Sequence, residues 1–291
     1  MIPMNRRAAT AEEQSQNDRK KHSRLDPVDP LLKWPGGKRA LFDSISEFMP
    51  EEFGRYWEPF VGGGAMFFAL CPKSATISDA NEDLIETYRV VRDAPEELIR
   101  RLRRMVNSED EYYRIRASRP RKRLGKAARF IYLCTLAFNG IHRYNLKGVF
   151  NVPYSFKTHL DVCDEQKIRD CSKRLRRSSI AHGDFEKIVQ NCKEGDLIYF
   201  DPPYTVAHNN NGFVKYNASI FSWKDQIRLA NCARTARQRG CYVLVSNADH
   251  DSLKALYTDF QCEILKRYSV MASSSAFRKP ITEALFWSHP R

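Results

Sequence analysis

The chain has 291 residues, of which 42% are hydrophobic, and a formal net charge of +13. A chain of this length and composition can bury a sizeable core, as one large domain or two smaller ones. Its longest apolar runs, LIYF (197–200) and CYVLV (241–245), are far shorter than the roughly 20 residues that a membrane-spanning helix needs. The composition therefore predicts a globular protein and excludes a transmembrane segment.

The positive charge is concentrated in one central stretch. Residues 90–178 contain 22 basic and 10 acidic side chains, so nearly all of the excess positive charge lies there. A basic block between nearly neutral blocks is typical of a surface that binds a polyanion, most often nucleic acid. A solvated helical surface is the alternative interpretation.

The first 30 residues are polar and contain no apolar core of the signal-peptide type. We expect residues 1–30 to form a disordered leader and the protein to be cytoplasmic. Eight cysteines are scattered without a Cys-x-x-Cys pair, and no His-x-x-x-His occurs. This spacing favours reduced thiols that are buried as small hydrophobic side chains, and we expect no structural zinc.

From residue 31 onwards the chain alternates between strand and helix patterns. A helix pattern covers 41–49, and residues 55–70 have the pattern of a short strand, a glycine turn and a helix. Residues 74–91 then give a strand that ends at Asp79, followed by another helix. This order predicts the beginning of a parallel α/β sheet.

After residue 90 the pattern becomes helical and basic as far as about residue 136. In residues 138–156, β-formers alternate with Asn-Gly and Lys-Gly turn signals, which indicates a hairpin or an irregular loop. The sheet pattern resumes at 178–188 and continues through strands near 197–200, 241–247, 262–270 and 282–287 and a helix near 223–239. The sequence therefore predicts one α/β domain (31–89 and 179–291) that is split by a basic insertion (90–178).

The stretch EPFVGGGA (58–65) follows the first predicted strand and opens a helix. Glycines at such a turn let a ligand approach the backbone closely, although turns of this kind are also common without a ligand. The dinucleotide fingerprint is excluded because Phe67 stands where its third glycine is required. PGGKR (35–39) is not a phosphate-binding P-loop, because Leu32 and Arg39 stand at its required glycine and hydroxyl positions.

Acidic residues follow several of the predicted strands. Asp79 lies 15 to 20 positions after the glycine turn, where an acid can accept hydrogen bonds from a ribose, and a helix N-cap is the alternative role. Asp184 lies at another strand end and could bond a purine amino group, or be a turn aspartate. Both positions are therefore candidates for binding a nucleoside.

The sequence LIYFDPPY (197–204) places Asp201 at the end of a buried-looking strand, before two prolines. Proline fixes its own φ and favours extended geometry in the preceding residue, so this carboxylate is held in a stiff turn. An exocyclic amine of a nucleobase is a poor nucleophile. A fixed carboxylate and a neighbouring carbonyl that accept its N–H bonds would favour its attack. Tyr204 could stack on such a base, which must first be flipped out of a duplex.

Five motifs in this order resemble the Dam-type DNA adenine N6-methyltransferases (D12 class, alpha group): LLKWPGGK, WEPFVGGGAMFF, SDAN, FNGIHRYNLKGVFNVP and DPPY. The resemblance covers about residues 31–287. It implies a Rossmann-like, S-adenosylmethionine-dependent methyltransferase sheet with an inserted, mainly helical target-recognition domain that bears a β-hairpin. It also implies an adenine-specific enzyme that acts on double-stranded DNA, releases S-adenosylhomocysteine and needs no metal. We expect a nucleoid-associated monomer.

The resemblance also implies roles for individual residues. The positions that match the family's cofactor-binding residues are Trp34, Gly36, Lys38, Glu58, Phe60, Gly62, Gly64, Asp79, Asp184 and Asp201. The catalytic positions are Asp201, Pro202, Pro203 and Tyr204. The positions that match the DNA-contacting hairpin are Phe138, Asn139, Ile141, Arg143 and Pro153. Phe138 matches a residue that wedges into the base stack, and Arg143 matches an arginine that reads guanine; a phosphate contact or a structural role is the alternative for Arg143.

Three further residues have a weaker assignment. Phe213 and Tyr216 could flank the flipped base, and Asn247 lies at another strand end, but a core or turn role fits each of them equally well.

The hairpin favours a GATC-like target. Other targets remain open, as do repair, phage defence and restriction as the cellular purpose. The rival hypotheses are methylation of cytosine N4, RNA or a protein amide, and a DNA-binding regulator that has lost its activity.

Overall fold

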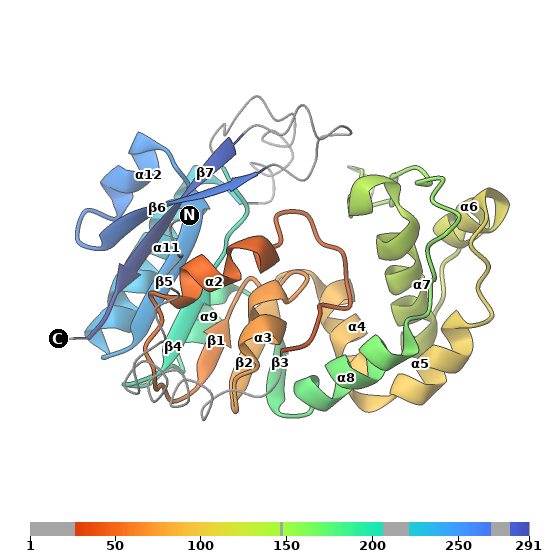
Figure 1. Cartoon of the computed structure of the whole chain (residues 1–291), viewed down its shortest axis with the longest axis horizontal. Coiled ribbons are helices and arrows are strands. Elements are labelled where there is room, and N and C mark those ends of the chain that lie inside the picture. The colour runs from red at the N-terminus through yellow and green to blue at the C-terminus, as the bar shows by residue number, and fades with distance from the viewer. Residues whose placement is uncertain (1–26, 146–147, 206–220, 269–279, 291) are drawn as a thin grey trace, which may run out of the picture.

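The computed structural model describes residues 27–145, 148–205, 221–268 and 280–290 (Figure 1). Within these residues the chain forms one seven-stranded sheet in the order β3-β2-β1-β4-β5-β7-β6. The strands are β1 (Tyr56–Glu58), β2 (Ala75–Asp79), β3 (Ser178–His182), β4 (Leu197–Phe200), β5 (Tyr242–Ala248), β6 (Gln261–Tyr268) and β7 (Pro280–Ser288). The first five strands are parallel, and β7 runs antiparallel to β5 and β6. The predicted Rossmann-like α/β sheet is confirmed.

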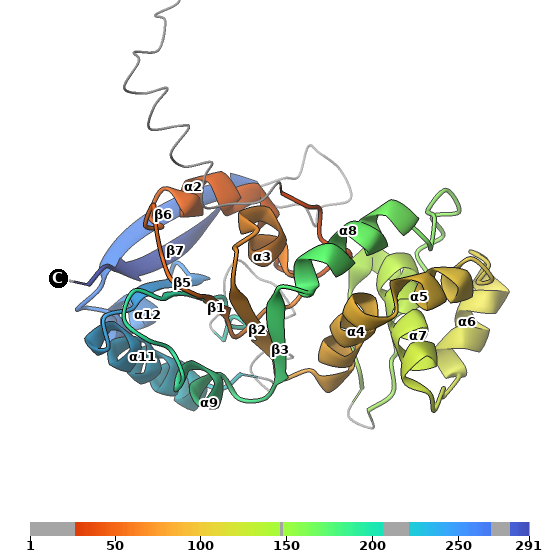
Figure 2. The ribbon, with the colours of Figure 1, turned by 90° about the horizontal axis from the view of Figure 1, so that it is seen from below.

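Helices cover both faces of the sheet, as the continuous apolar run of β4 requires. Leu197 and Tyr199 pack into one hydrophobic cluster, whereas Ile198 and Phe200 pack into another. One face carries α2 (Phe42–Ser46), which the short 3-10 turn η1 (Arg39–Leu41) precedes, and α3 (Ala65–Leu70); the other carries α9 (Phe185–Val189) and α11 (Trp223–Gln238) (Figure 2). A further short helix, α12 (Asp251–Leu256), follows β5.

The basic stretch is largely helical. It contains α5 (Pro95–Leu102), α6 (Glu109–Ala117), α7 (Arg123–Leu136) and α8 (Glu165–Leu175), and α5 to α7 lie at one end of the molecule (Figure 1). The hydrophobic core of these helices is continuous with one core of the sheet through α4 (Glu82–Asp93). The expected boundary after residue 89 lies within α4.

The expected hairpin is present in a reduced form between α7 and α8. Among its described residues, the antiparallel pairing is limited to two isolated bridges, Ala137 with Tyr154 and Tyr144 with Phe150. The single turn η2 (Phe138–Gly140) interrupts the segment at Asn139, whose φ of +53° is left-handed. Pro153 has no N–H to donate to a ladder. In the described part of this segment a regular pair of strands therefore does not form, although the two arms face each other.

Two simpler predictions concern the membrane and the cysteines. In the described part of the chain, no helix is long and apolar enough to cross a membrane. All eight cysteines are free thiols and six of them are buried, as expected for small hydrophobic side chains. The predicted leader, residues 1–30, lies outside the described residues except for its last four.

Candidate active site

Three acidic residues meet at the carboxyl edge of the sheet. Glu58 is the last residue of β1, Asp79 is the last residue of β2, and Asp201 follows β4 directly. Because β1 lies between β2 and β4, the three strand ends are neighbours. The chain winds outwards in opposite directions from β1 and β4, which is the topological switch point where open α/β sheets bind ligands. The strand ends predicted for Asp79 and Asp201 are confirmed.

Lys38 fixes the Asp201 carboxylate at this edge. Its ammonium Nζ lies 2.8 Å from Asp201 Oδ1 and 3.6 Å from Glu283 Oε2, and it donates a hydrogen bond to the Gly36 carbonyl at 2.9 Å. It also lies 5.1 Å from the ring centroid of Tyr204. Only 3% of Lys38 is exposed. Burial alone would lower the pKa of Lys38, but the Asp201 and Glu283 carboxylates raise it above its usual value, so Lys38 stays charged.

Glu58 is buried beside this ion pair. Its carboxyl Oε2 accepts a hydrogen bond of 2.8 Å from the Tyr56 hydroxyl. Burial, together with the negative charge of Asp201, raises the pKa of Glu58 to about 8, although the Tyr56 hydrogen bond opposes this shift. Glu58 is therefore mostly protonated at neutral pH.

The Asp79 carboxylate organises the glycine turn. It accepts hydrogen bonds from the backbone N–H of Gly62 at 3.1 Å and of Asn81 at 2.9 Å. Burial raises the pKa of Asp79 despite these bonds. The alternative role of Asp79 as a helix N-cap is not observed, because the Asn81 side chain caps α4 by accepting from the Leu84 N–H.

Packing accounts for two of the turn's glycines. Gly62 has a φ of +46°, and a Cβ there would lie 2.8 Å from the Trp34 ring. Gly64 has a φ of +72°, and a Cβ there would lie 2.8 Å from the Phe68 ring. Both are left-handed conformations that favour glycine. The glycine turn therefore packs closely against Trp34 and Phe68, while Asp79 holds its backbone.

Trp34 connects the glycine turn with residues 138–156, the predicted recognition segment. Its ring stacks on the His142 ring, with centroids 5.3 Å apart, and packs on Phe130 of α7. Burial, with a contribution from the Arg129 charge, lowers the pKa of His142 to about 4, so His142 is neutral in this stack. Phe60 instead packs on the other face of the sheet against Phe185 and Phe221.

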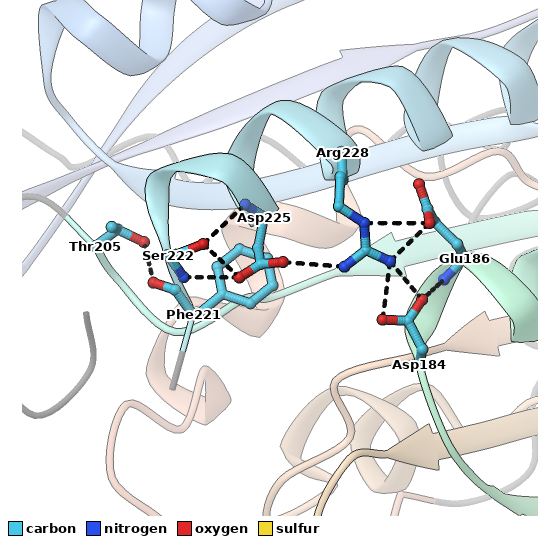
Figure 3. Close-up of polar contacts among 7 residues, drawn as sticks. All are labelled: Asp184, Glu186, Thr205, Phe221, Ser222, Asp225 and Arg228. Atoms are coloured by element: carbon cyan, nitrogen blue, oxygen red, sulfur yellow. Dashed lines mark hydrogen bonds and ion pairs between the residues drawn. The ribbon is translucent and has the colours of Figure 1, made fainter. Parts of the chain in front are cut away.

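Asp184 lies after β3, as predicted, but its carboxylate is engaged within the protein (Figure 3). Both oxygens accept from Arg228 Nη2, at 2.9 and 3.0 Å, and one of them caps α9 by accepting from the Glu186 N–H. Arg228 also pairs with Glu186 and Asp225. These contacts fit the alternative of a turn aspartate, and a role for Asp184 in binding adenine stays a prediction.

The predicted DNA-contacting residues lie together on the segment that follows α7. Phe138 is 49% exposed although it is a large apolar side chain, and its N–H donates to the Pro153 carbonyl. Arg143 Nε donates to the Asn151 side chain at 3.0 Å across the two arms. Asn139 is exposed and Ile141 is half-buried. Phe213 and Tyr216 lie outside the described residues.

Sequence reasoning did not find Glu283. This carboxylate lies in β7 and is only 1% exposed, yet it contributes to the ion pairs of Lys38. Its one local signal is an acidic residue inside the largely apolar strand ITEALFWS. A charge at such a position is expected to be paired when it is buried. Within the described residues, no group of His, Cys, Asp and Glu side chains could hold a metal ion.

Comparisons with known proteins identify the family. The model of the D12 class N6 adenine-specific DNA methyltransferases matches residues 34–271. A Type II methyltransferase, M1.LlaDCHI of Lactococcus lactis subsp. cremoris, is 38% identical and covers 88% of this chain and 94% of its own. The Type II methyltransferase M.MjaIII of Methanocaldococcus jannaschii is 36% identical over 80% of this chain and 89% of its own. A DNA adenine methylase of Vibrio cholerae is 31% identical over 89% of this chain and 96% of its own. The chain belongs to the D12 class of adenine-specific DNA methyltransferases.

Proposed function

We propose that this methyltransferase transfers a methyl group from S-adenosylmethionine to the exocyclic N6 of an adenine that is flipped out of duplex DNA. The observation that carries the proposal is the position of Asp201. This carboxylate begins Asp-Pro-Pro-Tyr, is held by the buried Lys38 ammonium, and lies at the switch point between β1 and β4. The product is S-adenosylhomocysteine.

The residues at the switch point fit S-adenosylmethionine. A carboxylate has about four acceptor sites, and Asp79 uses some of them for the backbone N–H groups of Gly62, Ala80 and Asn81, so a ribose hydroxyl can be bound at a remaining site. The glycine turn and Glu58 would hold the methionine part of the cofactor, with Trp34, Gly36 and Lys38 on the neighbouring segment. When bound, the cofactor supplies an electrophilic methyl group on a sulfonium.

The protein's task in this reaction is to orient the adenine amine. The lone pair of N6 is delocalised into the ring, and it becomes available when the nitrogen is pyramidal. The Asp201 carboxylate and the Pro202 carbonyl would accept the two N–H bonds and favour that geometry. The Lys38 ion pair and the two prolines keep these acceptors in place before the base arrives. Positioning of this kind needs no covalent intermediate on the enzyme.

The basic insertion would bind the duplex. Phe138 is an exposed aromatic side chain that can wedge into the base stack, and Arg143 can form two hydrogen bonds to a guanine. We propose a GATC-like target because this segment resembles the DNA-contacting hairpin of the Dam-type enzymes. Two relatives are named Type II methyltransferases, which supports a restriction-modification setting.

Tritiated methyl transfer from S-adenosylmethionine to duplexes that contain adenine tests the proposal. The wild-type protein should label N6 of adenine, and Asp201→Ala should abolish labelling while DNA binding, measured by anisotropy, persists. Asp251→Ala removes an exposed carboxylate beyond the next strand and is the matched control. Unchanged turnover of Asp201→Ala would overturn the mechanism. Binding without labelling by the wild type would indicate an inactive regulator, and label on cytosine would indicate the cytosine N4 alternative.

A further inference from the structure

A buried chain of hydrogen bonds connects the residue after Asp-Pro-Pro-Tyr with the middle of the sheet. Asn247 of β5 donates through Nδ2 to Gln226 Oε1 of α11 at 3.0 Å. Gln226 Nε2 donates to Thr205 Oγ1 at 3.0 Å, and this hydroxyl donates to the Phe221 carbonyl at 2.9 Å. Asn247 and Gln226 are both 0% exposed. These hydrogen bonds thus link β5 through α11 to Thr205 and Phe221.

The direction of every bond in this chain is fixed. Asn247 Oδ1 accepts from the Ala248 N–H, so its amide has one orientation, and this leaves Nδ2 to donate to Gln226. Gln226 must then present its own NH₂ to Thr205. An unsatisfied buried polar group costs about 1 to 3 kcal/mol, so breaking any link is unfavourable. The network therefore holds the Thr205 hydroxyl in a single place.

The helix around Gln226 does not need an amide for its own packing. The other buried side chains of α11 are aliphatic, as Leu229, Ala230 and Ala233 are, and they form the hydrophobic cluster on this face of the sheet. A buried glutamine among them is costly unless its hydrogen bonds are satisfied. The hydrogen bonds to Thr205 and Asn247 satisfy the Gln226 amide. These two contacts therefore explain why a glutamine occupies this buried position.

Thr205 is the last described residue of the catalytic turn. The opposite end of that turn, Asp201, is held by Lys38. Between the two lie Pro202, Pro203 and Tyr204, and the prolines leave few backbone torsions free. At its far end the network reaches Phe221, whose ring packs edge-on against Phe60 at 5.5 Å. Fixing both ends of a stiff turn fixes the Pro202 carbonyl and the Tyr204 ring between them.

We infer that Gln226 is a positioning residue for methyl transfer, with Asn247 as its support. It acts through Thr205, which sets the Pro202 carbonyl and the Tyr204 ring for the target base, and it does not touch the substrate. The inference rests on the proposed function of Asp-Pro-Pro-Tyr. Loss of the network should slow the chemical step and weaken the seating of the flipped base, while the affinity for S-adenosylhomocysteine stays the same.

The test compares Gln226→Leu and Thr205→Val, which remove the hydrogen bonds at nearly constant volume, with Thr205→Ser, which keeps the hydroxyl. Three quantities are measured on the full chain: the single-turnover methylation rate, the fluorescence of 2-aminopurine at the target position, and calorimetric binding of S-adenosylhomocysteine. Ser246→Ala is the control. Ser246 is the residue next to Asn247, and its hydroxyl forms a buried hydrogen bond of 2.8 Å with the Tyr199 hydroxyl. The substitution therefore removes a buried hydrogen bond outside the network.

We expect Gln226→Leu and Thr205→Val to lower the single-turnover rate by up to about 100-fold, the loss expected from a displacement of about 1 Å. Both should reduce the 2-aminopurine signal, whereas Thr205→Ser and the control should stay near the wild type. Equal losses in Ser246→Ala would show a merely structural role and overturn the inference. Wild-type rates in the two variants would overturn it while leaving the proposed function intact. A wild type without methyl transfer would overturn both.

Discussion

The carboxyl edge of the sheet and the recognition segment differ in how they hold their functional side chains. At the sheet edge Lys38, Glu58 and Glu283 are at most 3% exposed and are held by ion pairs and hydrogen bonds from several elements. In the recognition segment Phe138 is 49% and Phe156 is 64% exposed, and two isolated bridges join its arms. Changes at the edge should therefore affect folding and chemistry together, whereas changes in the segment should affect target choice alone.

The largest effect is expected from Lys38→Met. This substitution leaves the carboxylates of Asp201 and Glu283 without their shared cation at a buried site. Removing one partner of a buried ion pair costs about 3 to 5 kcal/mol, and we expect a loss of this size in the free energy of unfolding, measured by urea denaturation. Methyl transfer should fall to background, because Asp201 loses the Lys38 ammonium that holds its carboxylate.

Combining Lys38→Met with Glu283→Gln tests the cause of this stability loss. Glu283→Gln removes one of the two charges that Lys38 neutralises, so the double variant Lys38→Met, Glu283→Gln should be more stable than Lys38→Met alone. If the double variant lost as much stability as the two single variants together, the coupling between Lys38 and Glu283 would be contradicted. Activity should remain low in the double variant, since Asp201 still lacks the Lys38 ammonium.

A smaller effect, confined to recognition, is expected from Arg143→Ala. A bidentate contact to guanine contributes about 1 to 3 kcal/mol of discrimination, so relative activity on altered sites should rise by a corresponding factor while stability stays unchanged. Arg177→Ala, which removes an exposed arginine after α8, is the matched control and should keep wild-type sequence preference. If Arg143→Ala weakened all duplexes equally and reduced the salt slope by about one, Arg143 would be a phosphate contact.

A more gradual effect is a pH dependence of stability that arises at Glu58. In the folded protein Glu58 keeps its proton up to a pKa of about 8, whereas the unfolded chain releases it near the usual value of 4.5. The folded state therefore binds the extra proton between these values, and its stability should fall as pH rises from about 5 to 8, by at most about 1.4 kcal/mol per pH unit. Glu58→Gln should flatten this slope in urea titrations. An unchanged slope would show that Glu58 is ionised.

Local patterns in the sequence predicted much of the sheet edge. The apolar run before Asp201 is β4, and the alternation before Asp79 is β2, so both acids were correctly predicted to end strands. Local signals are sufficient there because a strand and the turn after it are set by neighbouring residues. The helix predicted near 223–239 is α11, and its Ser222 capping box is likewise a local feature.

The remaining features depend on contacts between distant parts of the chain. Glu283 meets Lys38 across 245 positions because β7 inserts between β5 and β6, and no local pattern determines that strand order. Asp184 could not be assigned from its own segment, since Arg228 comes from α11. The short pairing of the recognition segment follows from Asn139 and Pro153, whereas its contact with Trp34 required the folded chain.

Mapping N6-methyladenine by sequencing the DNA of cells that produce the protein tests the central claim most directly. Wild-type protein should methylate adenine at one short sequence, and Asp201→Ala should leave the same DNA unmethylated at equal protein levels. Arg143→Ala should spread methylation to related sequences. Methylation that persists with Asp201→Ala, or that falls on cytosine, would contradict the assignment of Asp201 as the residue that orients the adenine amine.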